Sequence, residues 1–179
     1  MKKWKSIFGA TLLSLALLGC AKTNQPSSPE EAKNAQTVTI GYTQFPINID
    51  PADEYNGWFT IRYGVGETLF KMNDQLEPEP WLAEKMEQTS QLEWKITLRN
   101  DVTFQNGEKM TGAKVESSLK RLIEKSKRAA ADLGIESIHS KGQTVTIKTK
   151  SEQPIMKNLL AEPYSVIVDV DGKSASDKA

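Results

Sequence analysis

The stretch WKITLRNDVTFQNGEKMTGAKVESSLKRLI, residues 94–123, decides the fold of this chain. At its start Trp94, Ile96 and Leu98 alternate with polar residues, which is the pattern of a strand with one buried face. A second short extended piece follows at 102–104, and the pair Asn106-Gly107 then predicts a turn because both residues tolerate positive φ.

The second half of this stretch predicts a helix. Thr111 can cap its start through the side-chain hydroxyl. The residues that follow place an apolar face opposite Lys and Arg, with apolar positions at helical spacing: Val115, Leu119, Leu122 and Ile123. The unit is therefore a strand, a turn and a capped helix.

This order and spacing resemble the extracytoplasmic solute-binding proteins of the peptide, opine and nickel class (family 5), which feed ABC importers. Eight residues match the pattern of that family: Trp94, Leu98, Arg99, Val102, Phe104, Gly107, Thr111 and Val115. The family usually has Asp where this chain has Lys114. A carboxylate there favours the helix N-terminus, so we expect a weaker helix start. Residues 62–69, RYGVGETL, look most like the nickel and metallophore-chelate branch.

The resemblance implies a mixed α/β fold, namely part of the first lobe of a two-lobe periplasmic-binding-protein-like structure. In that family the ligand is clamped between the lobes. This chain has 179 residues and matches only the first portion of the first lobe, so we expect a fragment or a truncated gene product. A normal ligand cleft needs groups from both walls.

Composition excludes several classes of protein. Lys plus Arg and Asp plus Glu each number 23, so the net charge is zero and gives no support for nucleic-acid binding. One Cys and one His allow no disulfide within the chain and no side-chain metal cluster.

The N-terminal residues read as a targeting segment. Three Lys in the first five residues precede an apolar run at 7–18, which is shorter than the roughly 20 residues of a membrane span. The run ends in LLGC, residues 17–20, which resembles the bacterial lipobox; the alternative is a Cys that follows a signal peptide by chance. We therefore expect a lipoprotein signal peptide at 1–20 with lipidation at Cys20, a flexible tether at 21–36 and the solute-binding domain at 37–179.

Further elements follow from local pattern. Alternation predicts strands at 37–42, 144–149 and 165–170. A short helix is expected near 58–69, weakened by two glycines, and another starts at Pro154. The central helix could continue through 129–133 until Gly134. Residues 78–83 resemble the Pro-x-Leu-Ala pattern that in the family precedes a short amphipathic turn, so we expect such a turn after Ala83.

Arg128 is the first candidate for contact with a ligand. The nickel-chelate relatives place an Arg here against carboxylates, which a guanidinium binds with two parallel hydrogen bonds. The alternative is a solvated charge at a helix C-terminus. The aromatic residue that those relatives carry three positions later is Ala131 here, which weighs against a nickel chelate.

Tyr55 and Trp58 are second candidates, as loop aromatics that the resemblance places toward the cleft. For Trp58 the core is the favoured alternative. His139 lacks ligand partners and reads as a surface residue, and the paired carboxylates fall on the tether or an exposed face. We find no nucleophile elbow and no phosphate-binding loop, so we expect neither catalysis nor a cofactor.

The resemblance implies a substrate-binding lipoprotein of an ABC importer, held on the outer face of the cell membrane. It would bind a peptide or a nickel or other metal chelate and deliver it to the permease subunits. The alternative is a truncated lipoprotein that keeps only an anchoring or interaction role. A hydrolase is a distant third, tested by a search for activity on peptides.

Overall fold

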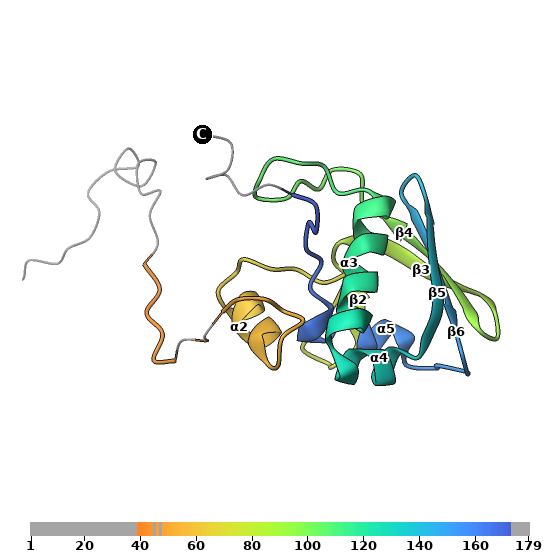
Figure 1. Ribbon diagram of the computed structural model, residues 1–179, viewed down its shortest axis with the longest axis horizontal. Helices are drawn as coiled ribbons and strands as arrows, with labels where there is room; N and C mark the ends of the chain where they lie inside the picture. The colour runs from red at the N-terminus through yellow and green to blue at the C-terminus, as the bar shows by residue number, and fades with distance from the viewer. Residues whose placement is uncertain (1–38, 45, 47, 173–179) are drawn as a thin grey trace, which may run out of the picture. The chain divides into compact units, whose positions relative to one another are not determined.

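The computed structural model describes residues 39–44, 46 and 48–172 (Figure 1). The chain divides into two compact units, 1–42 and 43–179. Of the first unit only 39–42 are described, so the predicted signal peptide, tether and Cys20 lie outside the described residues. Across the described part, no helix is long and apolar enough to span a membrane.

A four-stranded antiparallel sheet forms the centre of the second unit, with the order β3-β4-β6-β5. Its strands are β3 Ala83–Ser90, β4 Glu93–Leu98, β5 Ile135–Lys141 and β6 Thr144–Thr149. The strands predicted at 94–98 and 144–149 pair with each other, with Trp94 opposite Ile147 and Ile96 opposite Val145. Both predictions are confirmed.

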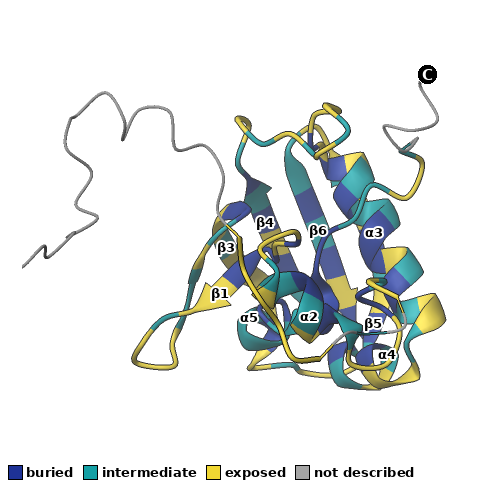
Figure 2. Cartoon of the chain, turned by 90° about the vertical axis from the view of Figure 1, so that its left-hand side faces the viewer, coloured by how far each residue is buried: buried dark blue, intermediate teal, exposed yellow. Residues whose placement is uncertain are grey.

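Helix α3, Gly112–Lys125, packs on one face of this sheet against β5 and β6. The alternating residues of β4 and β6 are buried on that face, and Figure 2 shows them as dark stripes along both strands. Ile96, Val145, Ile147 and Val115 are fully buried. Each such side chain contributes about 1.5–3 kcal/mol relative to exposure, so the sheet and α3 hold the unit together.

The remaining elements are small. They are α2 Asn56–Arg62, the hairpin of β1 Phe70–Met72 with β2 Pro78–Pro80, α4 Lys127–Leu133, α5 Met156–Leu159 and the 3-10 turn η1 Pro163–Ser165. Helix α2 contacts η1, and α5 contacts β1 and α4.

The turn and the helix cap formed as the sequence predicts. Gly107 has φ +85°, and the backbone N–H of Phe104 donates to the carbonyl of Glu108 at 2.8 Å. The Thr111 hydroxyl accepts from the backbone N–H of Lys114 at 3.3 Å, which satisfies one of the free donors at the start of α3.

Lys114 makes contacts that an Asp at this position could not make. Its ammonium lies 2.6 Å from Asp169 Oδ1 and 5.8 Å from the centre of the Phe104 ring. The same carboxylate accepts from Asn106 Nδ2 at 2.9 Å. Burial would raise the pKa of Asp169, but the hydrogen bonds from Lys114 and Asn106 outweigh it and hold that pKa below its ordinary value. Lys114 thus joins the start of α3 to two other segments.

Two predicted strands are wrong where they can be compared. The described part of 37–42 contains no strand, and neither does 165–170, which begins with the end of η1. In the second case other groups take the backbone donors: the N–H of Ile167 donates to the carbonyl of Glu67, and that of Val168 to the Ser118 hydroxyl, each at 2.9 Å. The apolar pattern there reflects burial in an irregular segment.

The central helix also ends earlier than predicted. Ser126 adopts extended angles (φ −99°, ψ 105°) and closes α3. Its hydroxyl accepts from the N–H of Ala129 and caps a separate helix, α4. Gly134, with φ 56°, ends α4 at the predicted residue.

Candidate functional site

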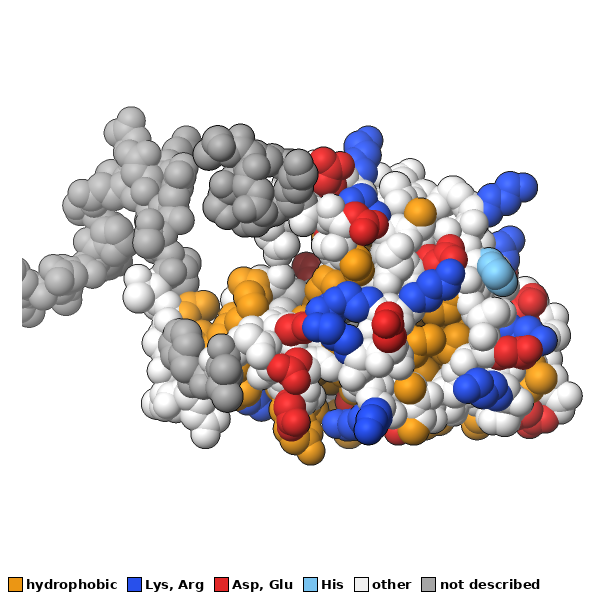
Figure 3. Space-filling view, in the orientation of Figure 1, with side chains coloured by type: hydrophobic (Ala, Val, Ile, Leu, Met, Phe, Trp, Pro, Cys, Tyr) orange, Lys and Arg blue, Asp and Glu red, His pale blue; other side chains and the backbone are white. Residues whose placement is uncertain are grey.

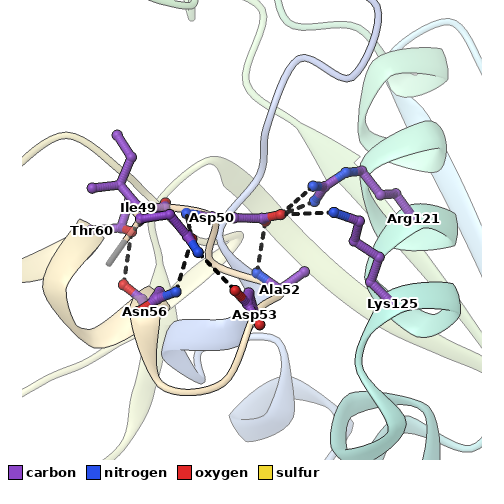
Figure 4. Close-up of polar contacts among 9 residues, drawn as sticks. Ile49, Asp50, Ala52, Asp53, Asn56, Thr60, Arg121 and Lys125 are labelled. Atoms are coloured by element: carbon purple, nitrogen blue, oxygen red, sulfur yellow. Dashed lines mark hydrogen bonds and ion pairs between the residues drawn. The ribbon is translucent and has the colours of Figure 1, made fainter. Parts of the chain in front are cut away.

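The loop 48–55 is fastened to helix α3 by the Asp50 carboxylate (Figure 4). Asp50 accepts from Arg121 Nη1 at 3.0 Å and from Lys125 Nζ at 3.1 Å, and its own loop contributes the N–H of Ala52 at 3.2 Å. The hydrogen bond from Arg121 is the largest cause of a low pKa, about 2, with burial opposing it and Lys125 assisting. The side chain is therefore charged near neutral pH.

Polar contacts within the loop fix it against helix α2. Asn48 donates to Asp53 Oδ2 at 2.8 Å and accepts from Asn56 Nδ2 at 2.9 Å. The Thr60 hydroxyl lies 3.1 Å from the carbonyl of Ile49 (Figure 4). These contacts set the position of the chain where it enters α2.

Helix α2 also packs closely against η1. Gly57 is buried, and a Cβ there would overlap the backbone carbonyl of Pro163 in η1. Only glycine allows this approach. Loop 48–55, α2 and η1 thus form a supported platform.

The three predicted ligand contacts line one hollow, with Tyr55 and Trp58 from this platform and Arg128 from helix α4. Tyr55, Trp58 and Arg128 line one hollow of about 360 Å³, together with Phe59 and Arg62. Tyr55 is 64% exposed and Trp58 is 43% exposed. The favoured prediction that Trp58 belongs to the core is therefore wrong: its ring is at the surface, on the outer side of a short helix. Trp94, in contrast, is core as predicted.

Arg128 lies in the first turn of α4, so it is not a charge at the C-terminus of α3. Its Nε is 3.5 Å from Asp132 Oδ2, its Nη2 is 3.9 Å from Glu162 Oε2, and its guanidinium carbon is 5.3 Å from the centre of the Tyr164 ring. The side chain remains 52% exposed. Ion pairs this long and this exposed contribute about 0–1 kcal/mol, so a ligand carboxylate can compete for the guanidinium.

Two of the other hollows of this unit are lined in part by residues of loop 48–55. One, of about 310 Å³, shares Tyr55 and Arg128 with the first and adds side chains of both charges, including Asp53, Glu54 and Lys127. The other, of about 540 Å³, is lined mainly by apolar residues, and its one charged lining residue, Asp169, is already paired with Lys114. It is larger, but it offers no cation to an anionic ligand, so the hollow at Arg128 is the better candidate.

The sequence reasoning missed Arg62 and the pairing of Asp50 with Arg121. Arg62 follows Trp58 by four residues, a spacing that places both on one side of α2, and that signal was present. The partners Asp50 and Arg121 are 71 residues apart, and no local pattern links them.

The predictions about His139 and about metal ligands can be compared with the described residues only. His139 is exposed on β5, as expected for a surface residue. No group of three or more His, Cys, Asp or Glu that could hold a metal ion occurs within 39–44, 46 and 48–172. On the face drawn in Figure 3, basic and acidic side chains are interspersed, in line with the net charge of zero.

The fold is that of part of a solute-binding protein of the periplasmic type. Residues 77–179 match the family model described as bacterial extracellular solute-binding proteins, family 5 Middle. The chain belongs to this family.

The chain is similar to a nickel-binding protein and to a dipeptide-binding protein. The chain is 34% identical over 173 residues to the nickel-binding protein NikA of Staphylococcus aureus, covering 97% of this chain and 32% of NikA. It is 28% identical over 142 residues to the dipeptide-binding protein DppE of Bacillus subtilis, covering 73% and 26%. The matched part thus spans between a quarter and a third of the length of these relatives.

Solved structures agree in fold. NikA of Staphylococcus aureus in complex with Ni(L-His)2 superposes with a TM-score of 0.60 at 42% identity, covering 62% of this chain and 24% of that chain. A nickel ABC transporter protein from Bacillus halodurans gives a TM-score of 0.66 at 35% identity, covering 70% and 26%. The mixed α/β structure is therefore part of a periplasmic-binding-protein fold.

Proposed function

We propose that this chain is the N-terminal part of the substrate-binding component of an ABC importer, and that it takes up an anionic chelate or peptide. The observation that carries the proposal is the hollow in which the exposed Arg128 stands beside Tyr55 and Trp58. A guanidinium can grip a carboxylate through two parallel hydrogen bonds, while the rings supply apolar contact area.

The chemistry proposed is reversible binding. A ligand on this wall would be enclosed when a second lobe closes over it, which excludes water and adds contacts from the other side. Nothing in this scheme requires catalysis, in keeping with a family of solute-binding proteins.

The ligand class follows from charge and from the relatives. NikA is named for nickel and DppE for dipeptides, and both metal–amino acid complexes and peptides carry carboxylates. The described residues offer no cluster of metal ligands, so we propose that a metal would arrive already held by a carboxylate-bearing chelator. The missing aromatic residue at Ala131 leaves the choice between chelate and peptide to experiment.

The test is titration of a protein that carries these residues and both lobes. Arg128→Ala should weaken binding of Ni(L-His)2, or of a peptide with a free carboxylate, on the order of 100-fold, because a charged hydrogen-bonded contact is lost. Arg128→Lys should recover only part of the affinity, since an ammonium cannot form the planar fork.

Arg99→Ala is the matched control. Arg99 is also a partly exposed Arg, paired with Asp101, and it lines none of the three hollows. Its loss should leave affinity unchanged. Equal binding by Arg128→Ala and the parent would remove the main support for an anionic ligand.

We also propose that the mature protein is lipidated at Cys20 and works on the extracytoplasmic face of the membrane beside its permease. The support is the basic start, the short apolar run and the sequence LLGC at 17–20. Labelling cells with a clickable fatty acid should mark the parent and not Cys20→Ser. A Cys20→Ser protein that stays equally labelled and membrane-bound would refute the assignment.

A further inference from the structure

The sequence contains two Asn-Gly pairs, and the structure places them in opposite surroundings. Asn106-Gly107 lies in the turn that precedes helix α3, and Gly107 is exposed there. Asn56-Gly57 lies at the start of helix α2, and Gly57 is buried. The difference has a chemical consequence, because an asparagine side chain reacts most readily with the backbone when glycine follows it and no side chain obstructs the approach.

The reaction is deamidation. The backbone nitrogen of the glycine bonds to the side-chain carbonyl carbon of the asparagine. The bond from that carbon to the side-chain nitrogen breaks, and this nitrogen leaves as ammonia with the proton of the glycine N–H. Water then opens the cyclic imide at either of its carbonyls, which leaves an aspartate or an isoaspartate. Oxidation states do not change, and the co-reactant is water.

Helix α2 holds Asn56-Gly57 away from this reaction. Asn56 is a helical residue, with ψ restricted to about −42°, whereas ring closure requires the chain at the asparagine to rotate out of the helix. That rotation would move Gly57 against the carbonyl of Pro163, which lies too close even for a Cβ. Asn56 Nδ2 also donates to Asn48 Oδ1 at 2.9 Å. The site opens only if loop 48–55, α2 and η1 come apart.

The turn at Asn106-Gly107 can open alone. The N–H of Gly107 donates to the carbonyl of Phe104, and the N–H of Glu108 to Asn106 Oδ1, each at 2.9 Å. Outside the turn, Asn106 Nδ2 donates to Asp169 Oδ2 at 2.9 Å. A Cβ on Gly107 would meet no atom of the described chain within 4 Å apart from its neighbours in sequence. Exposed turns open at a lower free energy than packed helices, so this pair can reach the reactive geometry while the sheet and α3 stay folded.

We propose that Asn106 is a deamidation site of this protein, and that its hydrogen bond to Asp169 controls the rate. The contact directs the amide toward the carboxylate of Asp169. The side chain must leave that carboxylate before its carbonyl carbon can meet the nitrogen of Gly107. The modification needs no ligand and no second lobe, so it is independent of the function proposed above.

Deamidation changes what residue 106 does in the fold. An aspartate has lost the Nδ2 donor and places a second carboxylate near Asp169, whose ammonium partner is Lys114 at 2.6 Å. An isoaspartate also adds a carbon atom to the backbone of the turn. Both products therefore weaken the junction between this turn, the start of α3 and the segment 166–172, and both lower the net charge of the chain from zero.

The experiment uses the folded 179-residue chain in mildly alkaline heavy-oxygen water. After digestion, peptide mass spectrometry measures the aspartate and isoaspartate formed at each Asn-Gly pair. Heavy oxygen marks product formed during the incubation, because opening of the imide takes up oxygen from water. We expect Asn106 to react at least about tenfold faster than Asn56 in the folded chain, and the two rates to become similar in urea, where both surroundings are lost.

The variants test the role of Asp169. Asp169→Ala should raise the rate at Asn106 several-fold and leave Asn56 slow, which also shows that α2 and its platform are still folded. Asp101→Ala is the matched control: its carboxylate pairs with Arg99 instead, so both rates should equal those of the parent. Asn106→Asp, which carries one of the two products, should unfold at a lower urea concentration than the parent.

Asn106 reacting as slowly as Asn56 in the folded chain would overturn the assignment of the site. A rate at Asn106 that Asp169→Ala leaves unchanged, or raises only together with the rate at Asn56, would overturn the control by Asp169. Unfolding of Asn106→Asp at the same urea concentration as the parent would overturn the proposed weakening of the junction.

Discussion

Asp50 supports the candidate site although it does not line the hollow. Its carboxylate joins loop 48–55 to Arg121 and Lys125 on α3, and this loop leads into the helix that carries Trp58 and Arg62. The pair is formed by groups that are both largely covered, so it is less screened than a fully exposed ion pair.

A pH dependence follows from the charge of Asp50. Its pKa in the folded chain is about 2, below the ordinary 3.8, so the folded state binds this proton less readily than the unfolded state. The stabilisation is therefore complete above the ordinary pKa and is lost as pH falls from about 5 towards 2. We expect Asp50→Asn to lower the free energy of unfolding by about 1–2 kcal/mol at pH 7, allowing for partial exposure, and by much less near pH 2.

Urea unfolding followed by Trp fluorescence at several pH values measures both effects. Asp101→Asn is the control, because Asp101 forms a more exposed pair with Arg99, and its loss should have a smaller effect. A constant difference between parent and Asp50→Asn from pH 7 down to pH 2 would contradict the proposed role of the carboxylate.

Single residues could be predicted where their surroundings are local. Thr111 as a cap and Trp94 as core follow from the few residues on each side, and both are confirmed. Trp58 was misplaced because spacing along a helix identifies an apolar position but does not show whether another element covers it. Arg62 could be identified only from the structure, because the hollow that it lines is completed by Arg128 from another helix.

At the level of elements, the start of α3 has an ion pair made by Lys114 in place of the family's Asp. The family pattern expects an Asp that favours the helix start. Here the Lys114–Asp169 ion pair, with Asn106 on the same carboxylate, joins α3 to the 102–107 turn and to the irregular segment 166–172. The sequence showed the departure from the pattern, but it did not show the partner 55 residues away.

Restoring the family residue should therefore destabilise this protein. In Lys114→Asp the new carboxylate would face Asp169, whose side chain is only 6% exposed and would lose its cation. We expect a loss of about 1–3 kcal/mol in the free energy of unfolding, because an unpaired buried charge costs more than the helix-start contact returns. Chemical unfolding of the purified variants gives the value.

A compensating change keeps the test specific. Lys114→Asp combined with Asp169→Asn removes the repulsion and should recover much of the loss. If Lys114→Asp alone were at least as stable as the parent, the ion pair would contribute nothing to the free energy of unfolding. The family's Asp would then stabilise this position at least as well as Lys114.

Elements were predicted well where the buried face alternates within one segment. Strands β4 and β6 and helix α3 have such faces, and their positions are confirmed. Strand β3 is a mostly exposed edge with little apolar alternation, so its residues read as a turn. The segment 165–170 has the apolar residues of a strand, yet its backbone bonds go to Glu67 and Ser118, which no pattern within the segment reveals.

At the level of the whole molecule, the matched part of the chain spans between a quarter and a third of the length of its named relatives. The wall that we propose for the ligand is made of loop 48–55, α2 and the start of α4, whose aromatic and cationic side chains line one hollow. The strand, turn and capped helix could be predicted from the stretch 94–123 itself, and the class of protein from the resemblance of that stretch to the family pattern. The ligand could not, because its recognition depends on groups brought together from several segments.

The openness of this wall leads to the last prediction. Tyr55 is 64% exposed, and Arg128 and Trp58 are each about half exposed, so a ligand on this surface would remain in contact with water on one side. Association costs several kcal/mol in lost freedom, which a few half-exposed contacts offset only in part. We therefore expect calorimetry of the 179-residue chain with di- to pentapeptides and with nickel chelates to show no submicromolar binding. A submicromolar Kd for this chain alone would mean that one wall suffices, and the need for a second lobe would have to be abandoned.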